Sequence, residues 1–407
     1  MKKSVSATTK LGEFVIEHLH DDPNKLILTG NKDYPDVDIK QAALQIECRR
    51  KTRKKLRNFN NHADFLYPTS LAAEQATHQG VALFHSRLLN GATNVLDMTA
   101  GLGIDAFSIA LADENNGVNV TALELDPLRA ATLRHNQIVL DLQNVKIIEG
   151  DSILWLQEQT DNNSSNQPLF DLIFIDPARR NQNGRTYFFS DCVPDVVSNR
   201  NLLIKASNRT LIKASPILDI TQALRELPEI SKFYIVCVKG ECKEVLCELS
   251  SVDTEPKIMV IDLDEDGNQI SEIEFSYSER GSRKATLLSE NFNVDEWNWL
   301  YDPNAGIHKA DCGSILCNLY PGLKRISTDT DLYVSKEKID GFPGRRFKIE
   351  EAADKTTGLN YDVAVRNYPL TSAQVVKKLK LNPGTDGKMM FGFRIGKKPI
   401  LIKTHKE

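Results

Sequence analysis

The chain has 407 residues, of which 41% are hydrophobic and 26% are charged, a composition typical of a globular protein with two or three domains. A net charge of −4 argues against a protein that coats nucleic acid indiscriminately. No apolar run approaches about 18 residues and the first residues lack the apolar core of a signal peptide, so we expect no membrane span and a cytoplasmic location. The seven cysteines lack the close Cys-x2-Cys pairs of zinc sites, so no metal is predicted.

Residues 1–65 are predicted to form an N-terminal helical region. Leu11, Phe14, Val15 and His18 repeat with the spacing of one helix face. A second helix is predicted over 39–57, and a third amphipathic stretch over 70–90 precedes the first buried strand.

Short apolar runs then alternate with helical stretches from about residue 66 to residue 280. The predicted strands are 95–98, 118–124, 144–148, 171–176, 209–213, 233–238 and 257–262, whereas residues 241–249 are predicted to be helical. A run of strand–helix units favours an α/β fold with a parallel sheet, here of seven strands, and helices on both faces.

The pattern changes beyond residue 280. Short mixed segments predict a small α+β domain over 281–345. A compact basic segment follows over 346–407, with a helix at 371–379 and a hairpin that pairs 389–395 with 399–402.

A glycine-bearing turn follows the first predicted strand, in the sequence Asp97-Met98-Thr99-Ala100-Gly101-Leu102-Gly103-Ile104-Asp105. Gly101 and Gly103 would let the backbone approach a ligand, and Asp105 lies at a helix start. One Gly-x-Gly is a weak signal alone, but Glu124 ends the next strand about 20 residues later, where a ribose diol is held.

Two further carboxylates lie after later strands. Asp151 follows the third strand and could accept a hydrogen bond from an adenine amino group, while Asp176 ends the fourth strand and faces the reaction centre. A dinucleotide fits less well, because the third glycine of its fingerprint is missing and an acidic residue in the turn would repel phosphate. The pattern therefore favours a cofactor with a sugar and a cation but no phosphate.

These motifs, in this order, resemble class I S-adenosylmethionine-dependent methyltransferases. The resemblance lies in Asp97-x-Thr-Ala-Gly-Leu-Gly, Glu124, Gly150-Asp151 and Asp176-Pro177-Ala178-Arg179. The whole chain resembles a bacterial subfamily in which the methyltransferase core is followed by a small ferredoxin-like domain and a C-terminal THUMP-like domain. Residues 301–310 and 366–370 carry that second likeness.

The resemblance implies a Rossmann-like methyltransferase domain over 66–280, a ferredoxin-like domain over 281–345 and a THUMP-like domain over 346–407. It implies S-adenosyl-L-methionine as cofactor and an activity of class EC 2.1.1.-. The implied cofactor-binding residues are Asp97, Thr99, Gly101, Gly103, Asp105, Glu124, Asp151 and Asp176, and the implied catalytic residues are Asp176, Pro177 and Arg179.

The acceptor is less well defined by these residues. Related base-modifying enzymes carry Asp-Pro-Pro-Tyr after the fourth strand, and the missing aromatic ring here disfavours amino-adenine, whereas the segment looks closer to the Asp-Pro-Pro-Arg of several RNA methyltransferases. Residues 213–216 lack the cysteine that carbon methylation of uracil needs. We therefore expect a nitrogen acceptor in RNA, either tRNA or rRNA. Arg179 or Arg180 would hold a substrate phosphate or form a structural ion pair.

Three points stay open at this stage. The basic run 49–57 is either an RNA contact or a solvated helix face, and the C-terminal segment is also basic. Glu74 and Gln75 lie on a helix that would either close over the methionine end of the cofactor or stay exposed. The alternatives for function are a methyltransferase acting on a protein or small molecule, and a non-catalytic RNA-binding protein on a methyltransferase fold.

Overall fold

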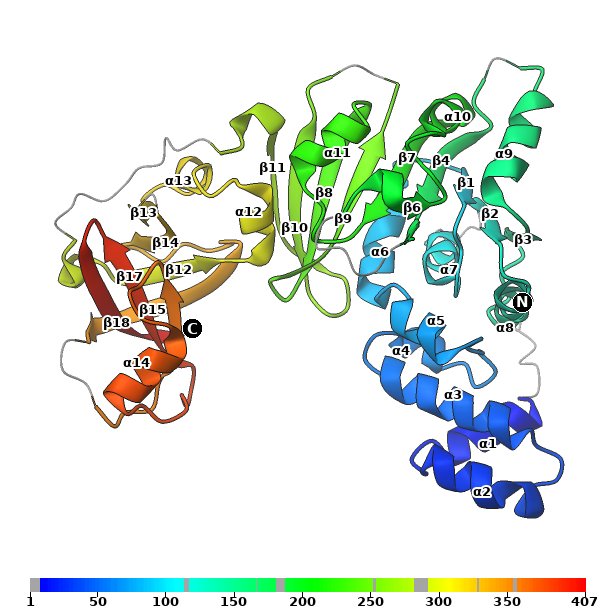
Figure 1. The fold of residues 1–407 in the computed structure, drawn as a ribbon, viewed down its shortest axis with the longest axis horizontal. Helices are drawn as coiled ribbons and strands as arrows, with labels where there is room; N and C mark the ends of the chain where they lie inside the picture. Colours follow the sequence, from blue (N-terminus) through cyan, green and yellow to red (C-terminus); the bar gives the residue numbers. More distant parts are fainter. Residues whose placement is uncertain are drawn as a thin grey trace. The chain divides into compact units, whose positions relative to one another are not determined.

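The computed structural model describes residues 8–112, 117–165, 167–180, 187–251, 254–281, 292–327, 329–353 and 357–407. The chain divides into two compact units (Figure 1). The first unit comprises residues up to Ser231 together with Leu246–Thr254 and Asp264–Asn268, and the second unit comprises Lys232–Val245, Glu255–Leu263 and Gln269–Glu407. Among the described residues, no helix has both the length and the apolarity needed to cross a bilayer.

The N-terminal region is helical, as the sequence predicts. Its helices are α1 (Lys10–Glu17), α2 (Pro23–Asp33), α3 (Ile39–Thr52), α4 (Arg57–Asn60), α5 (Ser70–Gln75) and α6 (Gln79–Arg87). The stretch predicted as one helix over 70–90 is two helices, because Ala76 adopts an extended backbone and His78 caps the next helix. Helices α1, α2 and α3 share a small core of Phe14, Val15, Leu26, Ile39, Ala42 and Ile46.

The first unit is built on parallel strands. They are β1 (Asn94–Asp97), β2 (Asn119–Glu124), β3 (Val145–Glu149), β4 (Phe170–Ile175) and β7 (Ser207–Ala214), in the order β3-β2-β1-β4-β7. The connecting helices are α7 (Ile104–Leu111), α8 (Pro127–Val139), α9 (Ser152–Asp161), α10 (Arg200–Ala206) and α11 (Ile220–Glu226). Strand order reverses between β1 and β4, which is the place where ligands bind in open α/β sheets.

The sheet continues beyond β7 through β9 (Glu241–Leu249), β8 (Ile230–Val238), β10 (Lys257–Leu263) and β11 (Gln269–Ser276). The α/β class is confirmed, but within the described residues the sheet has nine strands rather than seven, and the helix predicted over 241–249 is wrong. Lys239 and Gly240 both have positive φ, 53° and 77°, so they form a tight hairpin turn between β8 and β9. Residues 244–249 are all buried, and this hides the alternation that would have marked a strand.

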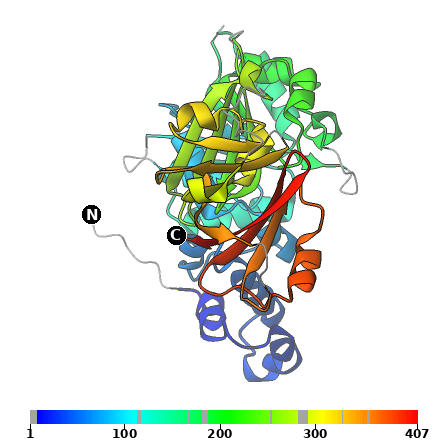
Figure 2. The ribbon, with the colours of Figure 1, turned by 90° about the vertical axis from the view of Figure 1, so that its left-hand side faces the viewer.

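The second unit also holds a seven-stranded sheet in the order β13-β14-β12-β15-β18-β17-β16. Its strands are β12 (Trp299–Pro303), β13 (Lys324–Ser327), β14 (Thr330–Ser335), β15 (Gly344–Ala352), β16 (Asp362–Arg366), β17 (Lys388–Ile395) and β18 (Lys398–Lys406). The predicted helix is present as α14 (Ser372–Leu379), and the predicted hairpin is the antiparallel β17–β18 pair (Figure 2). Strands from the segments 281–345 and 346–407 join in this one sheet, so the boundary between two domains there stays a prediction.

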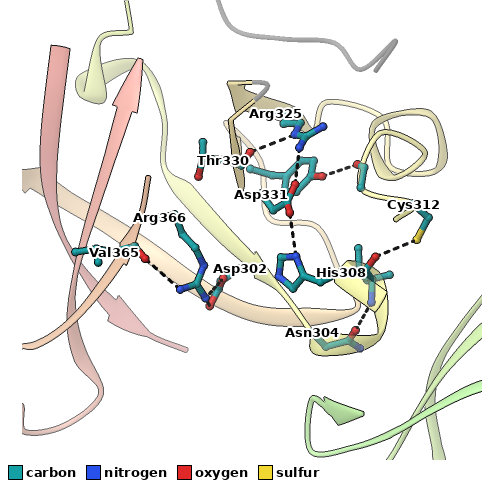
Figure 3. Close-up of polar contacts among 12 residues, drawn as sticks. Asp302, Asn304, His308, Cys312, Arg325, Thr330, Asp331, Val365 and Arg366 are labelled. Carbon is teal, nitrogen blue, oxygen red and sulfur yellow. Dashed lines mark hydrogen bonds and ion pairs between the residues drawn. The ribbon is translucent and has the colours of Figure 1, made fainter. Parts of the chain in front are cut away.

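A polar cluster ties the strands of the second unit to α12 (Ala305–Ala310) and to one another (Figure 3). The buried carboxylate of Asp302 accepts hydrogen bonds from Arg345 at 2.5 Å and from Arg366 at 3.0 Å. Asp331 pairs with both His308 and Arg325. Asp302 thus joins β12 to β15 and β16, and Asp331 joins β14 to β13 and α12.

Candidate functional site

The carboxyl ends of β1, β2, β4 and β7 bring four ionisable side chains to one edge of the first unit. They are Asp97, Glu124, Asp176 and Lys213. The register of the parallel strands places them there, because Asp97 pairs with Phe174 and Ile175 pairs with Ile212. Three of the four were predicted from the sequence, and the fourth, Lys213, was not.

The glycine turn connects β1 to α7 and has the tight conformation its sequence predicts. Gly101 and Gly103 have φ values of 56° and 85°. A Cβ at Gly103 would lie 2.4 Å from Leu133 Cδ1 and 2.6 Å from Phe107 Cε2, so only glycine fits there. At Gly101 a Cβ would have its nearest neighbour at 3.9 Å, so that side of the turn is open.

Glu124 anchors the turn. Its two carboxylate oxygens accept hydrogen bonds from the backbone N–H groups of Gly101 and Asp126, each at 2.9 Å. The side chain is buried, and each carboxylate oxygen has a second lone pair. Glu124 is thus fixed beside Gly101.

Asp97 is the deepest carboxyl group of the site and is 1% exposed. Burial raises its pKa to about 8, and the nearby carboxylates of Asp105, Asp176 and Glu124 act in the same direction. A hydrogen bond of 2.9 Å from the Thr99 backbone N–H opposes this rise only in part. A cation placed against Asp97 would therefore stabilise its carboxylate form and lower its pKa.

Thr99 joins β1 to β4. Its hydroxyl oxygen accepts a hydrogen bond of 2.6 Å from the Asp176 backbone N–H, so the glycine turn and the start of the Asp176-Pro177 segment are held together. The side chain of Asp176 is 40% exposed, and its Oδ2 accepts a hydrogen bond of 2.8 Å from Lys213 Nζ. Pro177 is buried beside it.

The other predicted site residues have partners within the chain. Asp151 caps α9, with Oδ1 accepting from the backbone N–H groups of Ile153 and Leu154. Asp105 is buried, and its two oxygens are bonded to Thr77 Oγ1 at 2.5 Å and to His85 Nδ1 at 2.7 Å. Asp105 is therefore held in place by the side chains of Thr77 and His85.

Arg179 belongs to β5 (Ala178–Arg179), which pairs with β6 (Cys192–Val193). Its guanidinium lies 5.5 Å from the ring centroid of Tyr187, which is buried. This cation–π contact fixes the arginine at the end of the Asp176 segment. Tyr187 has no sequence signal of its own, because it comes from a long connection without periodic pattern.

The basic run 49–57 is partly structural. Arg49 is 3% exposed, and its guanidinium donates hydrogen bonds to the carbonyls of Asn60, His62, Ala63 and Phe65. Arg53 and Lys54 are exposed, so these two fit a solvated face or a nucleic-acid contact. Lys55 Nζ donates to the Glu74 carbonyl at 2.5 Å. Glu74 and Gln75 are exposed, and a contact between them and a cofactor stays a prediction.

Comparison with known proteins adds to this geometry. A solved structure from Porphyromonas gingivalis W83, described as a "putative methyltransferase", matches with a TM-score of 0.81 and 23% identity over 97% of this chain and 97% of that chain. The two chains share a fold. The match extends over the N-terminal helices, the central sheet and the additional C-terminal sheet of this chain.

Two sequence comparisons cover shorter stretches. A family model described as a ferredoxin-like domain matches residues 299–343, inside the segment for which such a domain is predicted. The ribosomal RNA small subunit methyltransferase J of Saccharophagus degradans is 30% identical over 119 residues, which is 26% of this chain. This chain spans 40% of the length of that relative. Among the described residues, no group of three or more His, Cys, Asp or Glu side chains could hold a metal ion.

Proposed function

We propose that the chain is an S-adenosylmethionine-dependent methyltransferase that methylates a base nitrogen in RNA, with tRNA and rRNA as the substrate classes. The observation that carries the proposal is the strand edge where the buried Asp97, the anchored Glu124 and the half-exposed Asp176 surround one glycine turn. The fold shared with the Porphyromonas gingivalis structure supports it.

The chemistry of these side chains fits the cofactor. Asp97 is a buried carboxyl whose raised pKa a cationic amino group would restore toward its usual range. Glu124 offers two oxygens to a ribose diol, and Gly101 leaves room above the turn. Asp151 lies after β3 at the start of α9, where its carboxylate would accept from an adenine amino group. Asp105 supports the site through Thr77 and His85.

Asp176 is the residue proposed to act on the acceptor. When bound, the cofactor supplies a methyl group already activated on a sulfonium, so the chain mainly has to hold the acceptor in line with it. With Oδ2 engaged by Lys213, the other oxygen of Asp176 would accept a hydrogen bond from an acceptor N–H and take up its proton, while the methyl group would pass from the sulfonium sulfur to the acceptor nitrogen. The carbonyl of Pro177 would orient a second N–H.

The choice of RNA as substrate rests on two further observations. The relative from Saccharophagus degradans is a ribosomal RNA methyltransferase, and exposed cations lie on the N-terminal helices and the C-terminal sheet. Arg179 is placed at the end of the Asp176 segment, where its guanidinium would face a backbone phosphate of the substrate.

The test is transfer of label from methyl-radioactive S-adenosylmethionine to total RNA from cells that lack the protein. We expect label in RNA with the wild-type chain and a loss of at least about 100-fold with Asp176→Ala. Label in protein or in small molecules would show that one of these is the acceptor instead of RNA. Cofactor binding without transfer to any fraction would contradict catalysis.

A further inference from the structure

Lys213 is a nearly buried cation placed directly beside Asp176. Ile175 of β4 pairs with Ile212 of β7, so the residues that follow each of them are neighbours at the same strand edge. The Lys213 side chain is 14% exposed, against 40% for Asp176, and the two are joined at 2.8 Å. The lysine therefore holds the inner side of a carboxylate whose outer side reaches solvent.

A second set of bonds fixes Lys213 from behind. Its Nζ also donates to Thr77 Oγ1 at 3.0 Å, and the Thr77 hydroxyl donates in turn to Asp105 Oδ2 at 2.5 Å. Asp105 is held by His85, whose side chain is 0% exposed. Because the threonine proton points to Asp105, its lone pairs face the ammonium. The lysine is thus oriented by residues of α6, α7 and the segment before α6.

Lys213 also acts on other ionisable groups nearby. Its charge contributes, after burial, to lowering the pKa of Lys55 to about 8. It also helps, with His85 and Thr77, to lower the pKa of Asp105 to about 2 against the opposing effect of burial. Lys213 is the cation bonded to Asp176 among these groups.

We propose that Lys213 is a positioning residue for Asp176: it fixes one carboxylate oxygen, so that the other oxygen is presented to the N–H of the acceptor. This inference rests on the proposed function. The rest of the network, Thr77, Asp105 and His85, serves to hold the ammonium in place.

The loss of Lys213 should lower kcat without changing KM for the cofactor. Lys213→Met removes the charge and keeps most of the stem, so kcat should fall by about 100-fold, with KM for the cofactor nearly unchanged. Lys213→Arg keeps a cation and should restore kcat to within about tenfold of wild type. Lys146→Met, on an exposed site of β3, is the matched control and should change neither quantity.

The deciding measurement does not need methyl transfer. Crystal structures of the full chain are compared for wild type, Lys213→Met and Thr77→Val. We expect the Asp176 carboxylate to leave its wild-type position in both variants, more in the first, so that a lysine variant that fails to fold leaves the threonine variant to decide. An Asp176 carboxylate that keeps its position in both variants would overturn the proposal. Should no RNA accept a methyl group, the proposed function would fail while these structures still report on Lys213.

Discussion

At the scale of single residues, Asp97 determines how the site responds to pH. Burial raises its pKa to about 8, so the free protein carries a proton there at neutral pH. A ligand ammonium requires the carboxylate form, and binding must therefore expel that proton. Below the raised pKa, affinity should fall as pH falls, by up to about tenfold per unit.

This gives a prediction for S-adenosylmethionine binding to the wild-type chain. Between pH 6 and about 7.5 the affinity should rise with pH, with release of close to one proton per complex. Calorimetry in buffers of different ionisation enthalpy measures both quantities. Asp97→Asn has no proton to release, so it should bind weakly and without this pH dependence. Equal affinity of the wild type across the range, with no proton released, would rule out this role for Asp97.

Gly103 is the residue where backbone and packing both demand glycine. Alanine there combines a left-handed backbone, which costs about 1–2 kcal/mol, with overlap against Leu133 and Phe107, which adds about 1–3 kcal/mol. Gly91 has the same φ of 85° and nothing near its Cβ position, so Gly91→Ala isolates the backbone cost. Denaturant unfolding of the two variants should show the larger loss for Gly103→Ala. Equal losses would mean that the turn relaxes around the new methyl group.

At the scale of elements, α3 shows how one basic run serves two purposes. Arg49→Met leaves four backbone carbonyls without their guanidinium, so it should lower the free energy of unfolding by about 2–4 kcal/mol. Arg53→Met removes the same charge from an exposed position and should leave stability within about 0.5 kcal/mol. A similar stability for both variants, measured by urea unfolding, would contradict the structural role of Arg49.

Asp105 lies where α6 packs on α7, and its pKa predicts how the stability of the chain changes with pH. The pKa of Asp105 is lowered to about 2, below the usual unfolded value of about 3.9. A lowered folded-state pKa contributes stability that is present above about pH 4 and lost as pH falls toward 2. Asp105→Asn should therefore be less stable than wild type at pH 7, and the difference should shrink by about 2 kcal/mol on acidification. A constant difference in unfolding free energy would contradict the charged state of Asp105.

Elements were predictable from the sequence where short apolar runs end in polar residues, as in the strands β1, β2 and β4. The helix that became α14 was also predicted. The strand β9 was missed because six consecutive residues, 244–249, are buried and imitate a helix segment. Lys213 was missed because its partners Thr77 and Asp176 lie far away in sequence. The one available signal was a charged residue at the end of the run Thr-Leu-Ile-Lys.

At the scale of the whole molecule, the sequence predicted the α/β core, the N-terminal helices and an additional C-terminal part. It did not predict that β12 to β18 form one sheet, because that pairing depends on contacts between segments about 40 to 60 residues apart. Asp302 illustrates the gap. Its role as the common partner of Arg345 and Arg366 depends on three strands meeting.

The same limit applies to the substrate. Asp97, Glu124 and Asp176 could be located from motifs because the strand ends that carry them lie close in sequence to glycine and proline signals. An acceptor is recognised by side chains from several elements, and no single motif encodes it. Whether RNA is the acceptor therefore has to be decided by detecting the methyl group in the RNA itself.

The proposed methylation of RNA can be tested directly on the nucleosides of cellular RNA. RNA from cells lacking the protein is digested and compared by mass spectrometry with RNA from cells complemented by the wild-type chain or by Asp176→Asn. We expect one nitrogen-methylated nucleoside that disappears on deletion, returns with the wild type and does not return with the variant. An RNA nucleoside profile that is the same in all of these cells would contradict the proposed function.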